Sequence, residues 1–280
     1  MQLAVNETGR PEGGGTPLVL LHGVTRGRAD WGPVLPLLAA SRRVIAVDQR
    51  GHGASPRGGS YLVADYCADA VEFVRDRIGG PVVVVGHSLG AMVAAAVAAE
   101  LPGLVRAAVL EDPPFHGMGG RIAGTAWQAQ FVGMRAAARA GGGVDAIAAA
   151  LAEIRLPAPD GGTRRLGDIR DRGAIRWSAE CLAAADPEVL TPVIEGRWLD
   201  GYDPLAIAAR IRCPVLLLRA DPRLGGALDH AEGDAFEAAA ARCTSERYPG
   251  SGHLLHWLHP RQIAAAIDRF IREHVGEESS

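Results

Sequence analysis

Residues 82–99 have the sequence VVVVGHSLGAMVAAAVAA, in which Gly86-His87-Ser88-Leu89-Gly90 matches the pattern G-x-S-x-G. Four consecutive valines are typical of a strand buried on both faces, and the alanine-rich stretch that follows predicts a helix. A serine between such a strand and such a helix lies on a sharp turn, and the flanking glycines leave room for neighbouring backbone. The stretch therefore predicts that Ser88 is a nucleophile.

Other apolar runs occur at residues 17–21, 43–47, 105–110 and 214–218, and helical patterns separate them. Strands that alternate with helices are typical of a parallel sheet that is covered by helices on both faces. The predicted fold class is therefore α/β.

Residues 115–202 differ from the rest of the chain, because they show helical segments, glycine and proline breaks and no convincing strand. We interpret this part as a helical insertion. The expected organisation is a core formed by residues 1–112 and 205–280, with a helical cap at 113–204 that enters after the strand ending near Leu110.

Charge and composition exclude several classes of function. The chain of 280 residues has a formal net charge of −3, which gives no field to gather nucleic acid or an anionic membrane. All 29 basic residues are arginine, so mechanisms that need a lysine Schiff base or a Walker-type lysine are excluded. The expected partner is a small-molecule substrate, and the expected assembly is a monomer or homodimer.

The cysteines and the N-terminus predict a reducing compartment. Cys67, Cys181, Cys213 and Cys243 lie far apart in the sequence and form no C-x-x-C pair, so neither a metal site nor a disulfide framework is indicated. The first residues show no basic start followed by an apolar run. We therefore expect a cytoplasmic protein without a metal or other cofactor.

A serine hydroxyl needs a base to take its proton, and the base needs a third group to orient it. In a chain whose nucleophile is a G-x-S-x-G serine, the expected order is serine, acid, histidine. His253 follows a short strand near residues 245–248 and precedes the final helix, which makes it the predicted base. His256 and His259 recur at three-residue spacing, but without an accompanying carboxylate or cysteine we interpret them as helix-surface or pocket-edge residues.

These motifs resemble the α/β-hydrolase superfamily over nearly the whole chain. His22-Gly23 looks like the oxyanion turn of that family, and residues 48–55, DQRGHGAS, look like its D-x-R-G-x-G-x-S turn. The resemblance implies a mostly parallel central sheet of about eight strands. It also implies that the backbone N–H groups of Val24 and Leu89 form the oxyanion hole, whereas residues 48–55 most simply shape a loop.

Two carboxylates compete for the role of the acid. Members of the superfamily usually place it after the strand that follows the cap, where this chain has Asp221, two residues earlier than expected. A minority, including many haloalkane dehalogenases and zearalenone lactonases, place it after the strand that follows the nucleophile helix. Asp112 occupies that position, at the carboxyl end of a strand, and is the preferred acid.

The cap contributes large side chains that imply an apolar pocket over Ser88. Trp127, Phe131 and Trp177 are the predicted substrate-binding residues, although aromatic residues more often fill a core. The sequence thus predicts a serine hydrolase that cleaves an ester, a lactone or a related acyl bond. A C–C or amide hydrolase, or a lyase or cyclase, could use the same triad. A hydrolase-like receptor with little turnover is the alternative from another class.

Overall fold

The computed structural model describes residues 1–9, 15–158 and 161–276, and its centre is a seven-stranded sheet. The strand order is β1-β3-β2-β4-β5-β8-β9, in which β1 is antiparallel to β3 and the other neighbours are parallel. The strands are β1 (Val5–Thr8), β2 (Gly15–Leu21), β3 (Arg42–Val47), β4 (Val82–His87), β5 (Val105–Glu111), β8 (Val215–Ala220) and β9 (Cys243–Tyr248). This confirms the predicted α/β class, with seven strands in the described sheet instead of about eight.

Both faces of the sheet are buried, and the valines of β4 show how. Val82 and Val84 belong to one hydrophobic cluster, whereas Val83 and Val85 belong to the cluster on the opposite face. Successive side chains of a strand point to opposite faces, so a strand covered on both sides needs an unbroken apolar run. The run of four valines is therefore explained by the layered fold.

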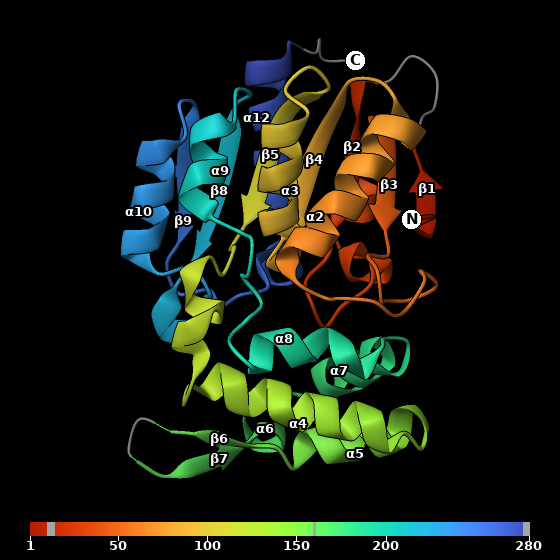
Figure 1. The fold of residues 1–280 in the computed structure, drawn as a ribbon, viewed down its shortest axis with the longest axis vertical. Helices are drawn as coiled ribbons and strands as arrows, with labels where there is room; N and C mark the ends of the chain where they lie inside the picture. Colours follow the sequence, from red (N-terminus) through yellow and green to blue (C-terminus); the bar gives the residue numbers. More distant parts are fainter. Residues whose placement is uncertain (10–14, 159–160, 277–280) are drawn as a thin grey trace.

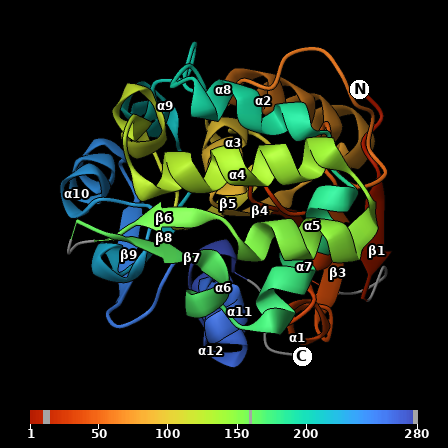
Figure 2. The same ribbon diagram turned by 90° about the horizontal axis from the view of Figure 1, so that it is seen from below.

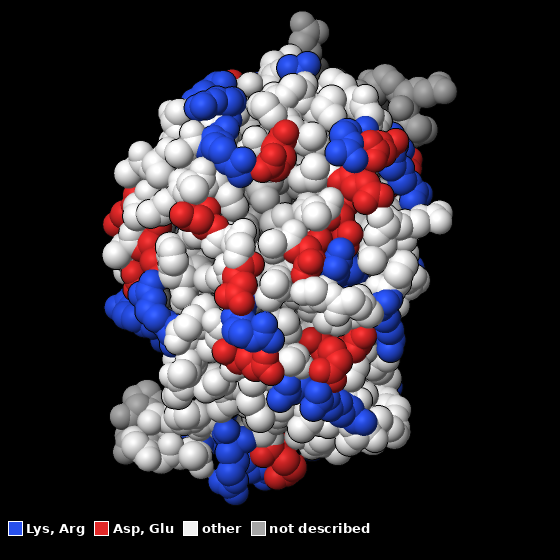
Figure 3. Space-filling model, viewed as in Figure 1, with Lys and Arg blue, Asp and Glu red and all other residues white. Residues whose placement is uncertain are grey.

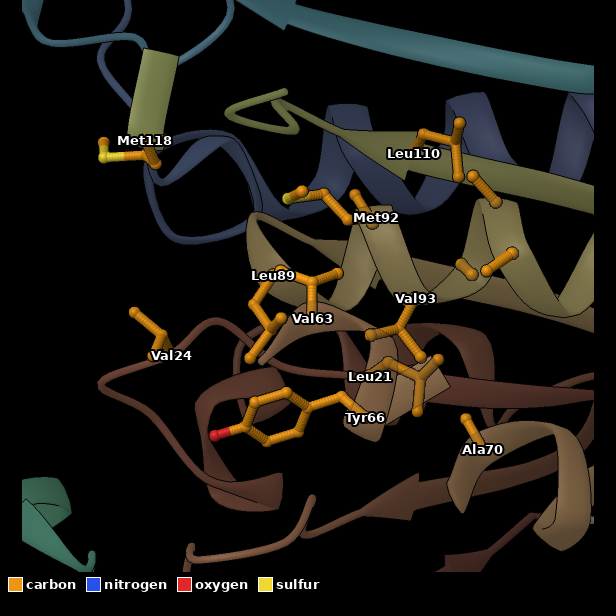
Figure 4. Packing of buried hydrophobic residues seen from close by; sticks show 14 of the residues in the cluster. Leu21, Val24, Val63, Tyr66, Ala70, Leu89, Met92, Val93, Leu110 and Met118 are labelled. Carbon is orange, nitrogen blue, oxygen red and sulfur yellow. The ribbon is translucent and has the colours of Figure 1, made fainter. Parts of the chain in front are cut away.

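Helices form a layer on each face of the sheet (Figure 1). On one face, side chains of β2, α2 and α3 meet in a buried cluster that includes Leu21, Tyr66, Leu89 and Val93 (Figure 4). The helices on this face are α2 (Val63–Glu72), continued by the π-helical turn η2 (Phe73–Ile78), α3 (Leu89–Glu100), α9 (Pro204–Arg210) and α10 (His230–Ala239). The helices of the other face are α1 (Leu35–Leu38), α11 (Leu255–Leu258) and α12 (Pro260–Val275), with the 3-10 turn η1 (Arg28–Trp31) beside them.

The described residues from 116 to 194, between β5 and α9 in the sequence, form a further layer, which we call the helical layer, at one end of the sheet (Figures 1 and 2). Its regular elements are η3 (His116–Met118), η4 (Gly120–Ile122), α4 (Ala126–Ala140), α5 (Gly143–Ala152), β6 (Arg155–Pro157), β7 (Thr163–Arg165), α6 (Leu166–Ile169), α7 (Arg172–Ala183), η5 (Pro187–Leu190) and α8 (Thr191–Ile194). The antiparallel pair β6–β7 corrects the expectation that this part holds no strand. Three-residue strands are too short to show a period.

The surface carries charges of both signs. On the face shown in Figure 3, acidic and basic side chains are intermixed over the sheet layers and over the helical layer. Among the described residues, no helix combines the length and the apolar character that crossing a lipid bilayer requires.

Candidate active site

Ser88 lies on the sharp turn between β4 and α3, as the sequence predicts. Its backbone has φ 55° and ψ −118°, a strained conformation for a residue with a side chain. A Cβ on Gly86 would lie 2.0 Å from the carbonyl oxygen of Gly90, and a Cβ on Gly90 would lie 1.9 Å from that of Leu21. Only glycine fits at both positions, so the close approach of β2, β4 and α3 fixes where Ser88 stands.

Asp112 and His253 meet at the carboxyl end of β5. His253 Nδ1 lies 2.6 Å from Asp112 Oδ2. The carboxylate of Asp112 also accepts backbone hydrogen bonds from Ala220 at 3.3 Å, Ala227 at 2.7 Å and Leu228 at 3.3 Å. Asp112 is fully buried and has a positive φ of 46°, which aspartate tolerates better than most residues. Because Nδ1 binds Asp112, Nε2 of His253 is left free to accept a proton from Ser88.

Asp221, the other candidate acid, has different partners. Its side chain caps the 3-10 turn η6 (Pro222–Leu224), accepts from the backbone of Arg223 at 3.0 Å and pairs with the guanidinium of Arg223 at 2.8 Å. It also accepts from the backbone N–H of Gly250. These bonds make Asp221 an organiser of the loops around η6, and the structure places Asp112 rather than Asp221 beside His253.

The two predicted oxyanion donors lie on either side of Ser88. The loop after β2 passes so close that a Cβ on Gly23 would be 3.3 Å from Cβ of Ser88, and Val24 follows it. Leu89 is the first residue of α3, where backbone N–H groups have no partner within the helix. Within the described ranges, the N–H groups of Val24 and Leu89 donate to no protein acceptor. Both remain free to bind an oxygen atom of a substrate.

Two side chains near these donors hold the loop after β2. The backbone N–H of Gln49 donates to Nε2 of His22, so His22 carries its proton on Nδ1, which contacts the carbonyl oxygen of Gly23. Burial lowers the pKa of His22 to about 4, with the neighbouring His52 adding to the effect. The side chain of Asp48 accepts from the backbone of Arg28 and of Ala54, which ties the D-x-R-G-x-G-x-S turn to η1. These residues shape the loop.

A cavity of about 1090 Å³ opens over Ser88 between the sheet and the helical layer. Ser88 and His253 both line it, together with the three predicted substrate-binding residues, Trp127, Phe131 and Trp177. The ring of Trp127 meets that of His253 edge to face, with centroids 5.4 Å apart. Met134 and Trp198 extend the apolar wall. The cavity thus joins the candidate catalytic side chains to a large apolar space.

A second charged cluster lies behind this site, and the sequence did not predict it. His256 is completely buried, which corrects its interpretation as a surface or pocket-edge residue. Its Nδ1 lies 2.8 Å from Oε1 of Glu111 and its Nε2 lies 3.3 Å from Oδ2 of Asp30. Burial alone would lower the pKa of His256, but the two carboxylates raise this pKa to about 9. The ring is therefore charged at neutral pH. His259, in contrast, is half-buried and bonds Ser251 at 2.6 Å.

The cluster also anchors the helical layer. Oδ1 of Asp30 accepts the indole N–H of Trp177, in α7, at 3.1 Å and that of Trp257 at 3.0 Å. Nε of Arg26 lies 3.8 Å from the same oxygen. Burial alone would raise the pKa of Asp30, but the charge of Arg26 and the hydrogen bond to His256 outweigh this effect and hold the pKa far below its usual range. The signal in the sequence was weak: an acid, Glu111, at the end of an apolar strand, and a histidine three residues after the predicted base.

His87 lies between the two histidines that bind carboxylates. Its ring centroid is 4.5 Å from that of His253 and 4.9 Å from that of His256, and its Nε2 contacts the carbonyl oxygen of His253 at 3.0 Å. Burial, followed by the charges of those two histidines, lowers the pKa of His87 well below the usual value. A neutral His87 therefore fits between them and helps to place the loop that carries His253.

Asp30, His87 and His256 are also close enough to be considered as metal ligands, because one ligand atom of each lies within 4.8 Å of the others. A metal-bound histidine must offer a nitrogen lone pair. Both nitrogens of His256 face carboxylate oxygens, and its raised pKa keeps both protonated at neutral pH. The donor set therefore suits a network of ion pairs better than a cation.

Replacing Glu111 with glutamine tests the charge on His256. Because the folded pKa of about 9 lies above the ordinary 6.5, protonation of His256 stabilises the fold fully below pH 6.5 and this contribution disappears as the pH rises through 9. We expect Glu111→Gln to lower the free energy of unfolding by about 2 kcal/mol at pH 6, and the difference from the wild type to shrink by pH 10. Urea unfolding across this range measures it; a difference that is constant with pH would contradict the assignment.

Comparison with known proteins places the chain in a family. A model described as the alpha/beta hydrolase family matches residues 18–266. The chain therefore belongs to the alpha/beta hydrolase family, as its motifs, fold and site arrangement indicate. This confirms the resemblance that the sequence motifs show.

Several hydrolases are similar to it. A 2-(acetamidomethylene)succinate hydrolase from Mesorhizobium japonicum is 40% identical over 105 residues, which are 37% of this chain and 37% of that protein, so the match spans well under half of that relative. The solved structure of an enol-lactonase from Burkholderia xenovorans LB400 has a TM-score of 0.73 at 19% identity and covers 96% of each chain. That of an E-2-(acetamidomethylene)succinate hydrolase has a TM-score of 0.61 at 26% identity, covering 96% of this chain and 94% of that one.

Proposed function

We propose that this protein is a serine hydrolase that cleaves a carboxylic ester, a lactone or a related acyl bond of a small, largely apolar molecule. The observation that carries the proposal is the hydrogen bond between Asp112 and His253 beside the strained Ser88, at the floor of one apolar cavity. Residues 113–204 would act as the cap that shapes this cavity. No metal or organic cofactor enters the reaction.

The proposed first step is attack on the substrate carbonyl by Ser88. Nε2 of His253 takes the proton from Oγ of Ser88, while Asp112 accepts from Nδ1 and stabilises the imidazolium that forms. The carbonyl oxygen gains negative charge and binds the free N–H groups of Val24 and Leu89, each contributing about 3 to 4 kcal/mol of transition-state stabilisation. Collapse of this intermediate releases the leaving group, which takes the proton from His253, and leaves an acyl-enzyme on Ser88.

The second step frees the enzyme. A water molecule gives a proton to His253 and attacks the acyl carbon, and the same two N–H groups hold the oxyanion. His253 then returns the proton to Oγ of Ser88, and the acid product leaves. The apolar walls of the cavity, among them Trp127 and Phe131, exclude bulk water and strengthen the electrostatic interactions in the site.

Cleavage of an amide or C–C bond is a second candidate that fits the site about equally well, since it needs the same groups. It is favoured by the relative whose name gives an acetamido compound as its substrate. The enol-lactonase supports the ester and lactone class in the same way.

A panel of substrates and a covalent probe test the proposal together. A fluorophosphonate probe should label one residue, and mass spectrometry should place the label at Ser88. We expect turnover of p-nitrophenyl esters and of at least one lactone; turnover confined to anilides or to diketones would favour the second candidate. Tight ligand binding with no label and no turnover would overturn the hydrolase proposal and support a receptor.

A further inference from the structure

Three arginines, Arg26, Arg170 and Arg176, line the same cavity as Ser88. Arg26 lies in the loop after β2, shortly beyond the proposed oxyanion donor Val24, and Arg170 ends α6 in the helical layer. Asp171 and Glu180 also line the cavity, and most of the other lining residues are apolar. A charged group in a cavity is costly unless it is paired or solvated, so we consider the partners of each arginine in turn.

The charge of Arg26 is already balanced within the protein. Its Nε lies 3.8 Å from Oδ1 of Asp30, and its Nη1 donates to Oγ of Ser178 at 3.4 Å. Asp30 and Glu111 supply two negative charges against Arg26 and the protonated His256. This buried group therefore has no net charge and leaves nothing over to neutralise another arginine.

Arg170 has no ion pair within the part of the chain that the structure describes. The adjacent Asp171 uses Oδ1 to cap α7 through the N–H of Ala174, at 2.9 Å. Arg176, a third arginine at the cavity, is paired with Asp145 at 2.7 Å and with Glu180 at 3.3 Å. Of these three arginines, Arg170 is the one that forms no ion pair in the described chain, and the neighbouring charge of Asp171 only partly offsets its own.

The surroundings of Arg170 are less favourable for its charge than open water. Arg170 is an exposed residue, yet desolvation by the protein around it lowers the pKa of its guanidinium. The charge of Arg26 lowers this pKa further, and the charge of Asp171 acts in the opposite direction. An anion placed between the two arginines would relieve both effects. A planar guanidinium suits a carboxylate, which it can bind through two parallel hydrogen bonds.

We propose that Arg170, with Arg26 beside it, binds a carboxylate of the substrate, so that the protein acts on acyl compounds with an apolar body and one anionic end. This inference rests on the proposed function, because it assigns a substrate class to the cavity over Ser88. The anion would lie on the wall formed by α6 and the loop after β2, and the scissile bond would lie at Ser88. Recognition of a charged end would also fix which carbonyl reaches the nucleophile.

Two esters with the same five-carbon acyl chain test this inference. Mono-p-nitrophenyl glutarate carries a free carboxylate, and p-nitrophenyl pentanoate does not. We expect the wild type to show a kcat/KM for the glutarate ester about 10- to 100-fold higher, as expected for a charge-assisted hydrogen bond. Arg170→Gln should bring the ratio of the two kcat/KM values close to one. Arg172→Gln changes an exposed arginine outside the cavity and is the matched control.

The outcomes separate the inference from the proposed function. Hydrolysis of pentanoate at the same or a higher rate than the glutarate ester would overturn the carboxylate site while leaving the hydrolase intact. If the wild type turns over neither ester, the proposed function fails in its ester form, and calorimetry with glutarate then decides about the site. If glutarate binds Arg170→Gln about tenfold more weakly than Arg172→Gln, the result supports the carboxylate site. Equal binding to the two variants, or binding to neither, rejects the site.

Discussion

Ser88→Ala is expected to lower kcat by about 10⁶-fold on the best ester substrate, because it removes the atom that forms the acyl-enzyme. A small residual rate over water should remain, since Val24 and Leu89 still present their N–H groups and the cavity still binds substrate. KM should change little. Steady-state kinetics on protein free of wild-type contamination measures the loss, and a burst of p-nitrophenol in the wild type should be absent from the variant.

Ser88→Ala should lose activity without losing stability. The strain at Ser88 comes from the backbone, at φ 55°, and alanine keeps the Cβ that this backbone already accommodates. The melting temperature should therefore stay close to that of the wild type. A variant that is folded and retains more than a few per cent of the activity would show that another residue is the nucleophile.

Asp112→Asn is expected to lower kcat by about 10⁴-fold while preserving most of the structure. An asparagine amide can donate to Nδ1 of His253 and so stabilise the wrong tautomer, with the proton on the nitrogen that should accept from Ser88. Asparagine tolerates the positive φ of 46° at this position, and its carbonyl oxygen can keep some of the bonds from Ala227 and Leu228. Steady-state kinetics on the same ester substrate measures the loss.

Asp221→Asn is the matched control for Asp112→Asn. Asp221 is also buried and also accepts backbone hydrogen bonds, but its cation is Arg223 and it makes no contact with His253 in the described chain. The substitution should change the stability of the loop around η6 and leave kcat within about tenfold. If the large loss appears in Asp221→Asn instead, the acid of this site has been assigned to the wrong strand end.

Much of the fold could be predicted because it depends on local patterns. The valines of β4 and the alanines of α3 show their structure in their own sequence, since a strand buried on both faces must be apolar throughout. Ser88 could be located by the glycines that the tight turn requires. His253 and Asp112 could be proposed because residues at the carboxyl ends of neighbouring parallel strands lie at one edge of the sheet.

The remainder depends on contacts between distant parts of the chain. The burial of His256 follows from Asp30, 226 residues away in the sequence, and no local pattern carries this information. β1 was not predicted, because four residues with one apolar side chain, Val5, give no period. Arg26 and Arg170 look like any other surface arginines until the fold brings the helical layer over the loop after β2.

The indole bond between Trp177 and Asp30 links the helical layer to the 3-10 turn η1 beside the sheet. α7 is held by a carboxylate whose charge is balanced by His256, so the free energy that docks α7 depends on a proton in the core. A rise of pH through about 9 removes that proton and leaves Arg26 as the remaining cation beside the buried carboxylates of Asp30 and Glu111. The shape of the cavity over Ser88 is thereby linked to the ionisation of His256, a side chain that does not line it.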